Sequence, residues 1–151
     1  MRTVIQRVSE ASVRVTAEGY ESCIGKGLLV LVAFIDEDTD EDLEWTAKKI
    51  ASMRIFDDAD GVMNLSVKDV GGDILAVSQF TLYASTVKGN RPSYIKAAKP
   101  EVAIPLYEKF LDKLESHLGC SVGKGIFGAD MKVSLLNDGP VTIIVDSKLK
   151  F

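Results

Sequence analysis

The sequence predicts an α+β fold: a single domain, residues 1–151, whose largely antiparallel or mixed, barrel-like β-sheet is covered by two main helices. Three observations lead to this fold class. A chain of 151 residues matches about one domain. Apolar segments of strand length outnumber segments with helical spacing, and consecutive strands are joined by short turns, as in hairpins. A content of 46% hydrophobic and 26% charged residues is ordinary for a folded protein and excludes intrinsic disorder.

The first third of the chain is expected to form strands. Ala11, Val13 and Val15 alternate with polar residues, which indicates a half-buried strand. The continuous apolar run from Leu28 to Phe34 indicates a strand buried on both faces. In order, the expected strands cover residues 4–8, 11–15, 20–24 and 28–34.

Two segments have helical signals. Thr39 is a typical capping residue, and the acidic residues 40–42 favour the positive end of a helix dipole, so a helix should run to near Met53. Pro100 suits the first position of a second helix, which Gly119 should end. The apolar residues of this second helix recur at helical spacing and should face the core: Ala103, Tyr107, Phe110, Leu111, Leu114 and Leu118.

The remaining segments are expected to form turns and further strands. The acidic segment 57–61 lacks the glutamate that a calcium loop needs at its twelfth position, so we interpret it as a solvated turn. A strand is expected over 74–82, and a short one is expected to start at Val122. The last two strands are expected over 131–136 and 141–145, joined by residues 137–140.

Several function classes are disfavoured. The longest apolar run has eight residues, far short of the 20 or so that a bilayer span needs, and no secretory signal is evident, so a cytoplasmic protein without a membrane partner is expected. Cys23, Cys120 and the single histidine, His117, do not make a standard zinc site, and we expect buried or idle thiols and a helix-end histidine. Residues 119–125 miss the phosphate-loop spacing. No metal and no cofactor are therefore expected.

Polar residues interrupt the apolar strand expected over 74–82. Ser78, Gln79 and Thr81 flank Phe80 and would project donors and acceptors near the strand end. From the residues alone, a functional strand end and an ordinary edge strand are equally good interpretations.

A second feature is a local basic stretch in a chain of net charge −4. Residues 74–100 contain no acid, yet they carry four cations, and Tyr83 and Tyr94 lie among them. Such a stretch can contact nucleic-acid phosphates, although a solvated loop is the commoner explanation. The four cations are Lys88, Arg91, Lys96 and Lys99. Because the rest of the chain is acidic, broad nonspecific binding to nucleic acid, including DNA, is not expected.

A third feature is Gly139-Pro140 between two apolar strands. Proline cannot donate to a sheet ladder, so it marks an edge or a turn, and an X–Pro bond is cis at small cost. A plain hairpin turn is the commoner explanation.

These features together resemble the D-aminoacyl-tRNA deacylase family over essentially the whole chain. Each motif is weak alone, but five in the right order are a specific signal. The motifs are Gln6-Arg7-Val8, Arg54-Ile55-Phe56 before Met63-Asn64-Leu65, Ser78-Gln79-Phe80-Thr81-Leu82, Gly89-Asn90-Arg91-Pro92-Ser93 and Asn137-Asp138-Gly139-Pro140-Val141-Thr142.

The resemblance implies a homodimer that hydrolyses the ester between a D-amino acid and the 3′-terminal ribose of tRNA, and also removes mischarged glycine. It implies a cis Gly139-Pro140 that reaches into the partner's site, holds the substrate's α-amino group with carbonyls and excludes L side chains. A water molecule assisted by the ribose 2′-hydroxyl would attack the carbonyl carbon of the ester. Backbone N–H groups near Phe80 and Thr81 would stabilise the oxyanion that forms on the carbonyl oxygen. Thr81 as nucleophile is the less favoured variant.

The resemblance also implies roles for the remaining candidates. Ser78, Gln79 and Thr81 would line the pocket for the terminal adenosine and the ester. Arg7 would support the cross-subunit loop through backbone carbonyls, and Phe127 with Met131 would wall the adenosine pocket, core packing being the alternative. Lys88, Arg91, Lys96 and Lys99 would face the acceptor stem.

Three alternatives stay open at this point. A related branch with a trans Gly-Pro bond edits L-alanine on threonine tRNA, although Ser78-Gln79 together with Gly139-Pro140 favours the D-specific branch. A noncatalytic nucleic-acid-binding module would bind without turnover. A purely structural dimer would use Gly139-Pro140 only as a tight turn.

Overall fold

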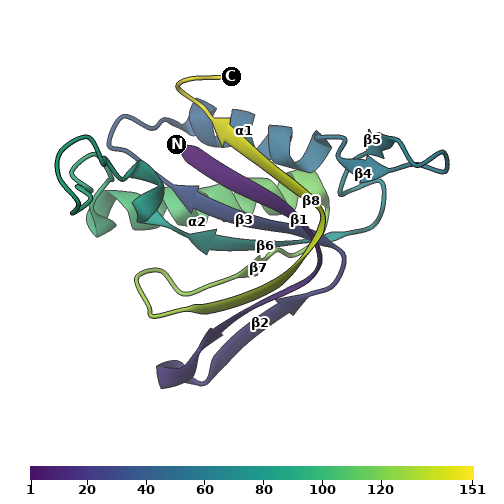
Figure 1. The fold of residues 1–151 in the computed structure, drawn as a ribbon, viewed down its shortest axis with the longest axis horizontal. Helices are drawn as coiled ribbons and strands as arrows, with labels where there is room; N and C mark the ends of the chain where they lie inside the picture. Colours follow the sequence, from purple (N-terminus) through teal and green to yellow (C-terminus); the bar gives the residue numbers. More distant parts are fainter.

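The sheet is built around one long strand, β1 (Arg2–Val15), which is paired along both of its edges (Figure 1). The computed structural model describes residues 1–151. On one edge β1 pairs antiparallel with β3 (Gly27–Ala33) and then with β2 (Tyr20–Ile24). On the other edge it pairs antiparallel with β8 (Lys132–Asp146) along nearly its whole length.

Two further strands make the sheet mixed. β6 (Asp73–Ser78) pairs parallel with β3, and β7 (Gly123–Lys124) pairs parallel with β6. The sheet order is β2-β1-β3-β6-β7, with β8 added on β1, and the sheet curls into a nearly closed barrel (Figure 1). A 3₁₀ turn, η1 (Thr16–Glu18), joins β1 to β2. This architecture confirms the predicted α+β fold with a mixed sheet.

Two helices pack against each other and cover one face of the sheet (Figure 1). α1 (Asp40–Ser52) begins at Thr39, whose side chain and that of Asp42 form the expected capping box. α2 (Pro100–Leu118) continues through Pro105 and ends at Gly119, which has a left-handed φ of 84°. All six residues predicted for its inner face are buried.

The hydrophobic core has two parts, one on each side of the sheet. The larger cluster joins α1 and α2 to one face, with Leu28, Ile74 and Phe110 fully buried in it. The smaller cluster lies inside the curl, where Leu29 and Leu75 contact Val8 and its neighbours. Because side chains of a strand alternate between faces, β3 and β6 supply both clusters, which explains their continuous apolar sequences.

Two strands are longer than the sequence suggested. The predicted strands 4–8 and 11–15 are one strand, β1, and the predicted strands 131–136 and 141–145 are one strand, β8. Residues 137–140 are therefore not a hairpin turn. Gln6 pairs with Thr142, and Val8 pairs with Asn137. The four residues 138–141 therefore lie opposite Arg7 alone and form a large, irregular bulge.

The strand predicted over 74–82 is shorter than expected. β6 ends at Ser78, and Phe80–Tyr83 form a 3₁₀ turn, η2. The hydrogen bond from the Gln79 N–H to the Val32 carbonyl, 2.7 Å, is the last backbone link to β3 before the chain turns. The acidic segment 57–61 is the turn of an unpredicted small hairpin, β4 (Phe56–Asp57) and β5 (Met63–Leu65).

Neither helix combines the length and the apolar character that crossing a bilayer requires. Cys23 and Cys120 are unpaired and exposed, so the expectation of buried thiols is wrong.

The Asp42 carboxylate, at the start of α1, generates a prediction about acid stability. It accepts hydrogen bonds from Lys148 Nζ at 2.6 Å and from the Thr39 N–H at 2.8 Å. Burial acts to raise its pKa, but these bonds outweigh burial and hold the pKa well below the ordinary 3.8. Because the folded-state pKa is lowered, this carboxylate stabilises the fold above about pH 4, and the stabilisation is lost as the pH falls further.

Asp42→Asn should therefore lower the free energy of unfolding by about 1 kcal/mol at pH 7, and the difference from wild type should shrink below about pH 4. Urea denaturation across this pH range measures both quantities. Asp112→Asn, at an exposed position of α2 without an ion pair, is the control and should follow wild type. A difference between Asp42→Asn and wild type that does not change with pH would contradict the assignment.

Candidate functional site

The predicted catalytic residues lie where β6 gives way to η2. Ser78 and Gln79 are half-buried, and Phe80 is exposed at the first position of η2. The Gln79 side-chain amide donates to Thr81 Oγ1 at 2.5 Å, which orients the hydroxyl. The first N–H groups of a helical turn have no partner within the turn, so Phe80 and Thr81 lie where backbone donors are available to a ligand.

No basic side chain contacts the Thr81 hydroxyl; its hydrogen-bond partner is the Gln79 amide. The single histidine does not contact Thr81, because His117 lies in the last turn of α2 and its hydrogen-bond partner is on α1. There its Nε2 lies 2.6 Å from Glu44 Oε1 of α1. The arrangement therefore lacks the nucleophile–base pair of a triad hydrolase.

The Gly139–Pro140 segment lies in the bulge of β8, and its peptide bond is cis. Arg7, only 7% exposed, lies beneath it. Arg7 Nε donates to the Asp138 carbonyl at 2.9 Å, and Nη1 donates to the Ile55 carbonyl at 2.7 Å. The carboxylates of Asp57 and Asp138 each lie 3.6 Å from its guanidinium. Arg7 is thus a buried link between two backbone segments, rather than a surface arginine.

Gly139 leaves little room for a side chain. Its φ of 130° is a conformation that L side chains rarely adopt, and a Cβ atom there would lie 3.0 Å from Arg7 Nη2. The close approach of Arg7 to the bulge therefore depends on glycine at this position.

The two motifs lie apart within one chain. Arg2 Nη1 donates to the Leu82 carbonyl at 3.0 Å, so η2 is tied to the first residue of β1. Arg7 ties the Gly139–Pro140 bulge five residues further along the same strand. Five residues of extended chain span roughly 16 Å. The η2 turn and the bulge are therefore anchored to positions roughly 16 Å apart on one strand, and no hydrogen bond links Thr81 to Gly139 within the chain.

Phe127 and Met131 pack against different parts of the core. The ring centroids of Phe127 and Tyr107 are 6.0 Å apart, and Phe127 borders the larger cluster. Met131 borders the smaller cluster, to which Val13 and Val77 belong. Both side chains are half-buried, so core packing is the contact that the structure shows for them.

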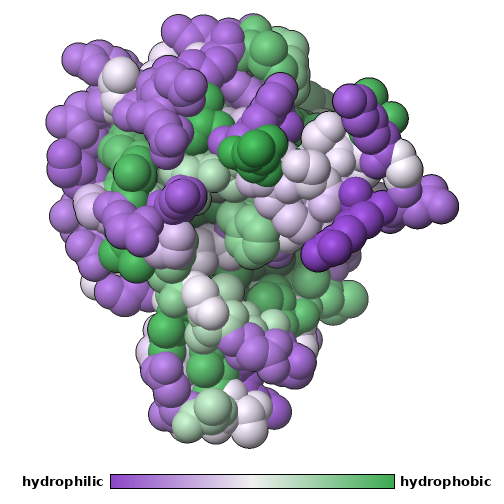
Figure 2. All heavy atoms as spheres, turned by 90° about the vertical axis from the view of Figure 1, so that its left-hand side faces the viewer, coloured by the Kyte–Doolittle hydropathy of each residue, from purple (hydrophilic) through white to green (hydrophobic).

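The four predicted tRNA-binding cations are exposed on the segment between η2 and the start of α2. None of them forms an ion pair. The segment projects at one end of the molecule in Figure 1, and Figure 2 faces that end. The cations are Lys88, Arg91, Lys96 and Lys99.

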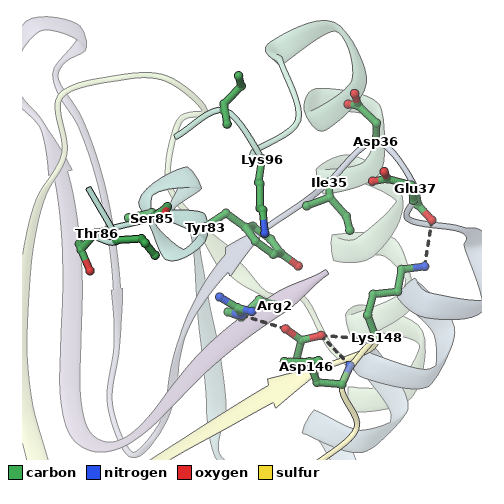
Figure 3. Close-up of a pocket in the computed structure, with 14 residues that line it drawn as sticks. Arg2, Ile35, Asp36, Glu37, Tyr83, Ser85, Thr86, Lys96, Asp146 and Lys148 are labelled. Carbon is green, nitrogen blue, oxygen red and sulfur yellow. Dashed lines mark hydrogen bonds and ion pairs between the residues drawn. The ribbon is translucent and has the colours of Figure 1, made fainter. Parts of the chain in front are cut away.

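A cleft of about 970 Å³ adjoins the end of η2, and its lining includes Tyr83 but not Thr81 (Figure 3). Arg2, Tyr83 and Lys96 enter it from β1, η2 and the segment after η2. Arg2 Nε donates to Asp146 Oδ2 at 2.8 Å, and burial raises the pKa of Tyr83, whose buried hydroxyl has no partner within the protein. Sequence reasoning missed Arg2 and Asp146, because their proximity depends on the pairing of the chain ends. The only signal was Tyr83 beside the polar motif.

No group of three or more His, Cys, Asp and Glu side chains is placed to hold a metal ion. The carboxylates nearest the two motifs, Asp57 and Asp138, face Arg7. The donors available at η2 are backbone N–H groups, hydroxyls and an amide.

Comparisons with known proteins agree on one family. The sequence model of the D-Tyr-tRNA(Tyr) deacylase family matches residues 4–146. Proteins named D-aminoacyl-tRNA deacylase from Parabacteroides distasonis and Flavobacterium johnsoniae are 62% identical over 150 residues and 64% identical over 149 residues. These alignments cover 99% of both chains in the first case and 98% of both in the second.

Solved structures have the same fold. A c-Myc DNA unwinding element binding protein superposes with a TM-score of 0.88 at 41% identity, covering 97% of this chain and 98% of that one. A probable eukaryotic D-amino acid tRNA deacylase superposes with a TM-score of 0.82 at 21% identity, covering 95% and 97%, which shows a shared fold. Since the family model extends over both the η2 segment and the Gly139–Pro140 bulge, the chain belongs to the D-Tyr-tRNA(Tyr) deacylase family.

Proposed function

We propose that this chain hydrolyses the ester bond between a D-amino acid and the 3′-terminal ribose of tRNA, releasing both, in the cytoplasm where charged tRNA is used. Membership of the family supports the reaction class, and relatives above 60% identity carry the name D-aminoacyl-tRNA deacylase. The observation that carries the proposal is the separation of the η2 donors from the Gly139–Pro140 bulge along β1. If the η2 donors and the Gly139–Pro140 bulge are the two halves of one site, a second chain is needed to bring a bulge to each η2.

The ester would be bound at η2. The N–H groups of Phe80 and Thr81 would donate to the carbonyl oxygen as it becomes an oxyanion, which is where preorganised donors contribute most to acyl transfer. Ser78, Gln79 and Thr81 would line the space for the adenosine and the ester. Because no side-chain base adjoins Thr81, the attacking water would be assisted by the ribose 2′-hydroxyl.

The Gly139–Pro140 bulge would supply the chiral selection from the partner chain. Backbone carbonyls can hold an ammonium group, which carries three donors and no acceptor. A buried Arg7 holds the bulge in place, so an L side chain directed at it would meet a rigid backbone. When the backbone excludes L side chains, the identity of a D side chain does not matter. Glycine would also be accepted, since it has no side chain to exclude.

The outer edge of β8 offers a surface for the second chain. β8 pairs only with β1, so its other edge is open. Leu135, Leu136 and Ile144 on this strand are large apolar side chains that are exposed in the single chain. Long apolar edge strands are covered in most proteins, often by a second copy. A homodimer through this region would place the bulge of one chain toward η2 of the other.

Phe127 and Met131 would wall the adenosine pocket from the core side, and the exposed cations at 88–99 would face the acceptor stem. A noncatalytic nucleic-acid-binding module is the second candidate function, favoured by these unpaired cations. The related trans branch acting on L-alanyl-tRNA is the third.

The first test compares D-tyrosyl-tRNA with L-tyrosyl-tRNA. Purified protein should hydrolyse the D ester roughly a hundredfold faster or more, because the L side chain is excluded rather than bound more weakly. Release of labelled tyrosine measures both rates, and glycyl-tRNA should also be cleaved. Binding of tRNA without hydrolysis of either ester would favour the binding module, and cleavage of L-alanyl-tRNA alone would favour the trans branch.

The second test concerns Thr81. Thr81→Ala should keep at least about a tenth of wild-type kcat/KM, because the hydroxyl is a lining group without a base. Loss of a catalytic nucleophile typically costs more than about a thousandfold. Single-turnover hydrolysis of D-tyrosyl-tRNA separates these outcomes. Thr81→Ser is the matched control; a large loss with alanine that serine restores would establish the nucleophile instead.

The third test is complementation between two inactive variants. Gly139→Ala should spoil the bulge, and Thr81→Trp should block η2. If each site combines two chains, a mixed dimer contains one intact site, and a random mixture should recover about a quarter of wild-type activity. Each variant alone, checked for folding by circular dichroism, is the control. Absence of recovery despite formation of mixed dimers would show that one chain builds the whole site.

A further inference from the structure

An exposed aromatic pair lies beside η2. The rings of Phe80 and Tyr94 meet edge to face, with centroids 5.2 Å apart and planes at 77°. Phe80 remains 54% exposed and Tyr94 39% exposed. Neither ring belongs to the core clusters. Because an edge-to-face contact covers only part of each ring, this pair presents aromatic surface to solvent.

The backbone around Tyr94 is fixed rather than free. Ser85 and Ser93 exchange two backbone hydrogen bonds of 2.8 Å and 2.9 Å, which folds residues 85–93 back on themselves. The N–H of Ala97 donates to the Tyr94 carbonyl at 3.0 Å. The N–H of Ala98 donates at 2.9 Å to the carbonyl of Phe34, the residue directly after β3. Tyr94 is therefore held between two anchored points, next to the first residue of η2.

The chain segment that carries the pair has only positive charges, whereas the adjoining cleft is also lined by Asp36, Glu37 and Asp146. Residues 74–100 contain no acid, and the neighbouring cations Arg91 and Lys96 form no ion pair. Ile95, which is 90% exposed, and Lys96 continue from Tyr94 along the wall of the cleft beside η2 (Figure 3). Figure 2 shows hydrophobic side chains exposed among hydrophilic ones at this end of the molecule.

Aromatic faces next to unpaired cations suit single-stranded nucleic acid. Bases stack on such rings with little dependence on sequence, while the cations take the phosphates. Unpaired nucleotides, rather than duplex, are what proteins recognise by stacking in RNA. The acceptor stem is a duplex, whose phosphates the cations could contact. Its paired bases are not free to stack on the aromatic pair, so the pair needs unpaired nucleotides.

We propose that Tyr94, together with the side chain of Phe80, forms a stacking surface for the unpaired nucleotides that precede the terminal adenosine of tRNA, with Lys96 beside their phosphates. This inference rests on the proposed function, which places the terminal ribose at Phe80 and Thr81. From there the RNA strand leaves the site past the exposed pair. Tyr94 would thereby contribute to the recognition of tRNA as a polymer, separately from the chemistry at η2.

The test compares two substrates in each variant: D-tyrosyl-tRNA, and D-tyrosyl adenosine, which carries the ester but none of the preceding nucleotides. Tyr94→Ala should lower the ratio of their kcat/KM values about tenfold or more, the loss expected when one stacked base loses its ring. Tyr94→Phe keeps the ring and should restore the ratio to within about twofold of wild type. Ile95→Ala, which removes a more exposed but non-aromatic neighbour, is the matched control.

The outcomes separate this inference from the proposed function. If wild type hydrolyses neither ester, the proposed function fails. If wild type hydrolyses both and the ratio is unchanged in Tyr94→Ala, the stacking surface is wrong and the proposed function stands. If Tyr94→Ala loses activity equally on both substrates, Tyr94 only supports the position of η2, and the inference is also overturned.

Discussion

A buried guanidinium holds the most unusual backbone of the molecule in place. Arg7 lies within β1, where the pairing with β8 is interrupted. Its side-chain N–H groups donate to the Asp138 carbonyl in the bulge and to the Ile55 carbonyl just before β4. A buried charge is tolerated only when it is well hydrogen-bonded, so Arg7 in turn requires these carbonyls. The bulge and the arginine therefore stabilise each other, and Gly139 is the residue that permits their approach.

The length of β1 then determines how the candidate site is divided. Arg2 at one end contacts the Leu82 carbonyl of η2, and Arg7 contacts the bulge. Both contacts come from the same strand, so neither half-site can move toward the other without breaking the central pairing of the sheet. A strand paired on both edges is a rigid spacer. The separation is thus a built-in property of the fold, and under the proposed function a second chain on the open β8 edge would complete the site.

Local signals predicted the elements that local physics determines. Thr39 and Asp42 form the capping box, and the apolar spacing of α2 matches its buried face, because caps and helical periodicity act within a few residues. The predictions that failed concern strand boundaries, which depend on pairing between distant parts of the chain. Ser9 and Glu10 interrupt the apolar alternation, yet β1 continues, because β8 pairs across a bulge there. Gly139-Pro140 has the composition of a turn, but pairing with β1 on both sides keeps it within β8.

The residues of the candidate site could be predicted from the sequence, but their arrangement in space could not. The Ser78-Gln79-Phe80-Thr81 motif was recognisable from its polar residues, whereas its change from strand to 3₁₀ turn depends on where β3 stops supplying partners, at the Val32 carbonyl. Sequence also did not reveal that Tyr94 returns to Phe80, because the Ser85–Ser93 bridge that brings it back is formed by two common residues.

The chemistry available at η2 follows from this turn. Residues 78–81 contain no group that titrates near neutral pH, so their contribution consists of fixed dipoles: N–H groups of a helical turn, two hydroxyls and an amide. Fixed dipoles stabilise a developing oxyanion without reorganising during the reaction, whereas a general base would have to be held at a matched pKa. Under the proposed function, the substrate is an activated ester, and its ribose carries a hydroxyl on the carbon beside the ester-bearing one. Backbone donors and an excluding backbone loop would then suffice for its hydrolysis, and specificity would reside in shape rather than in an ionisable residue.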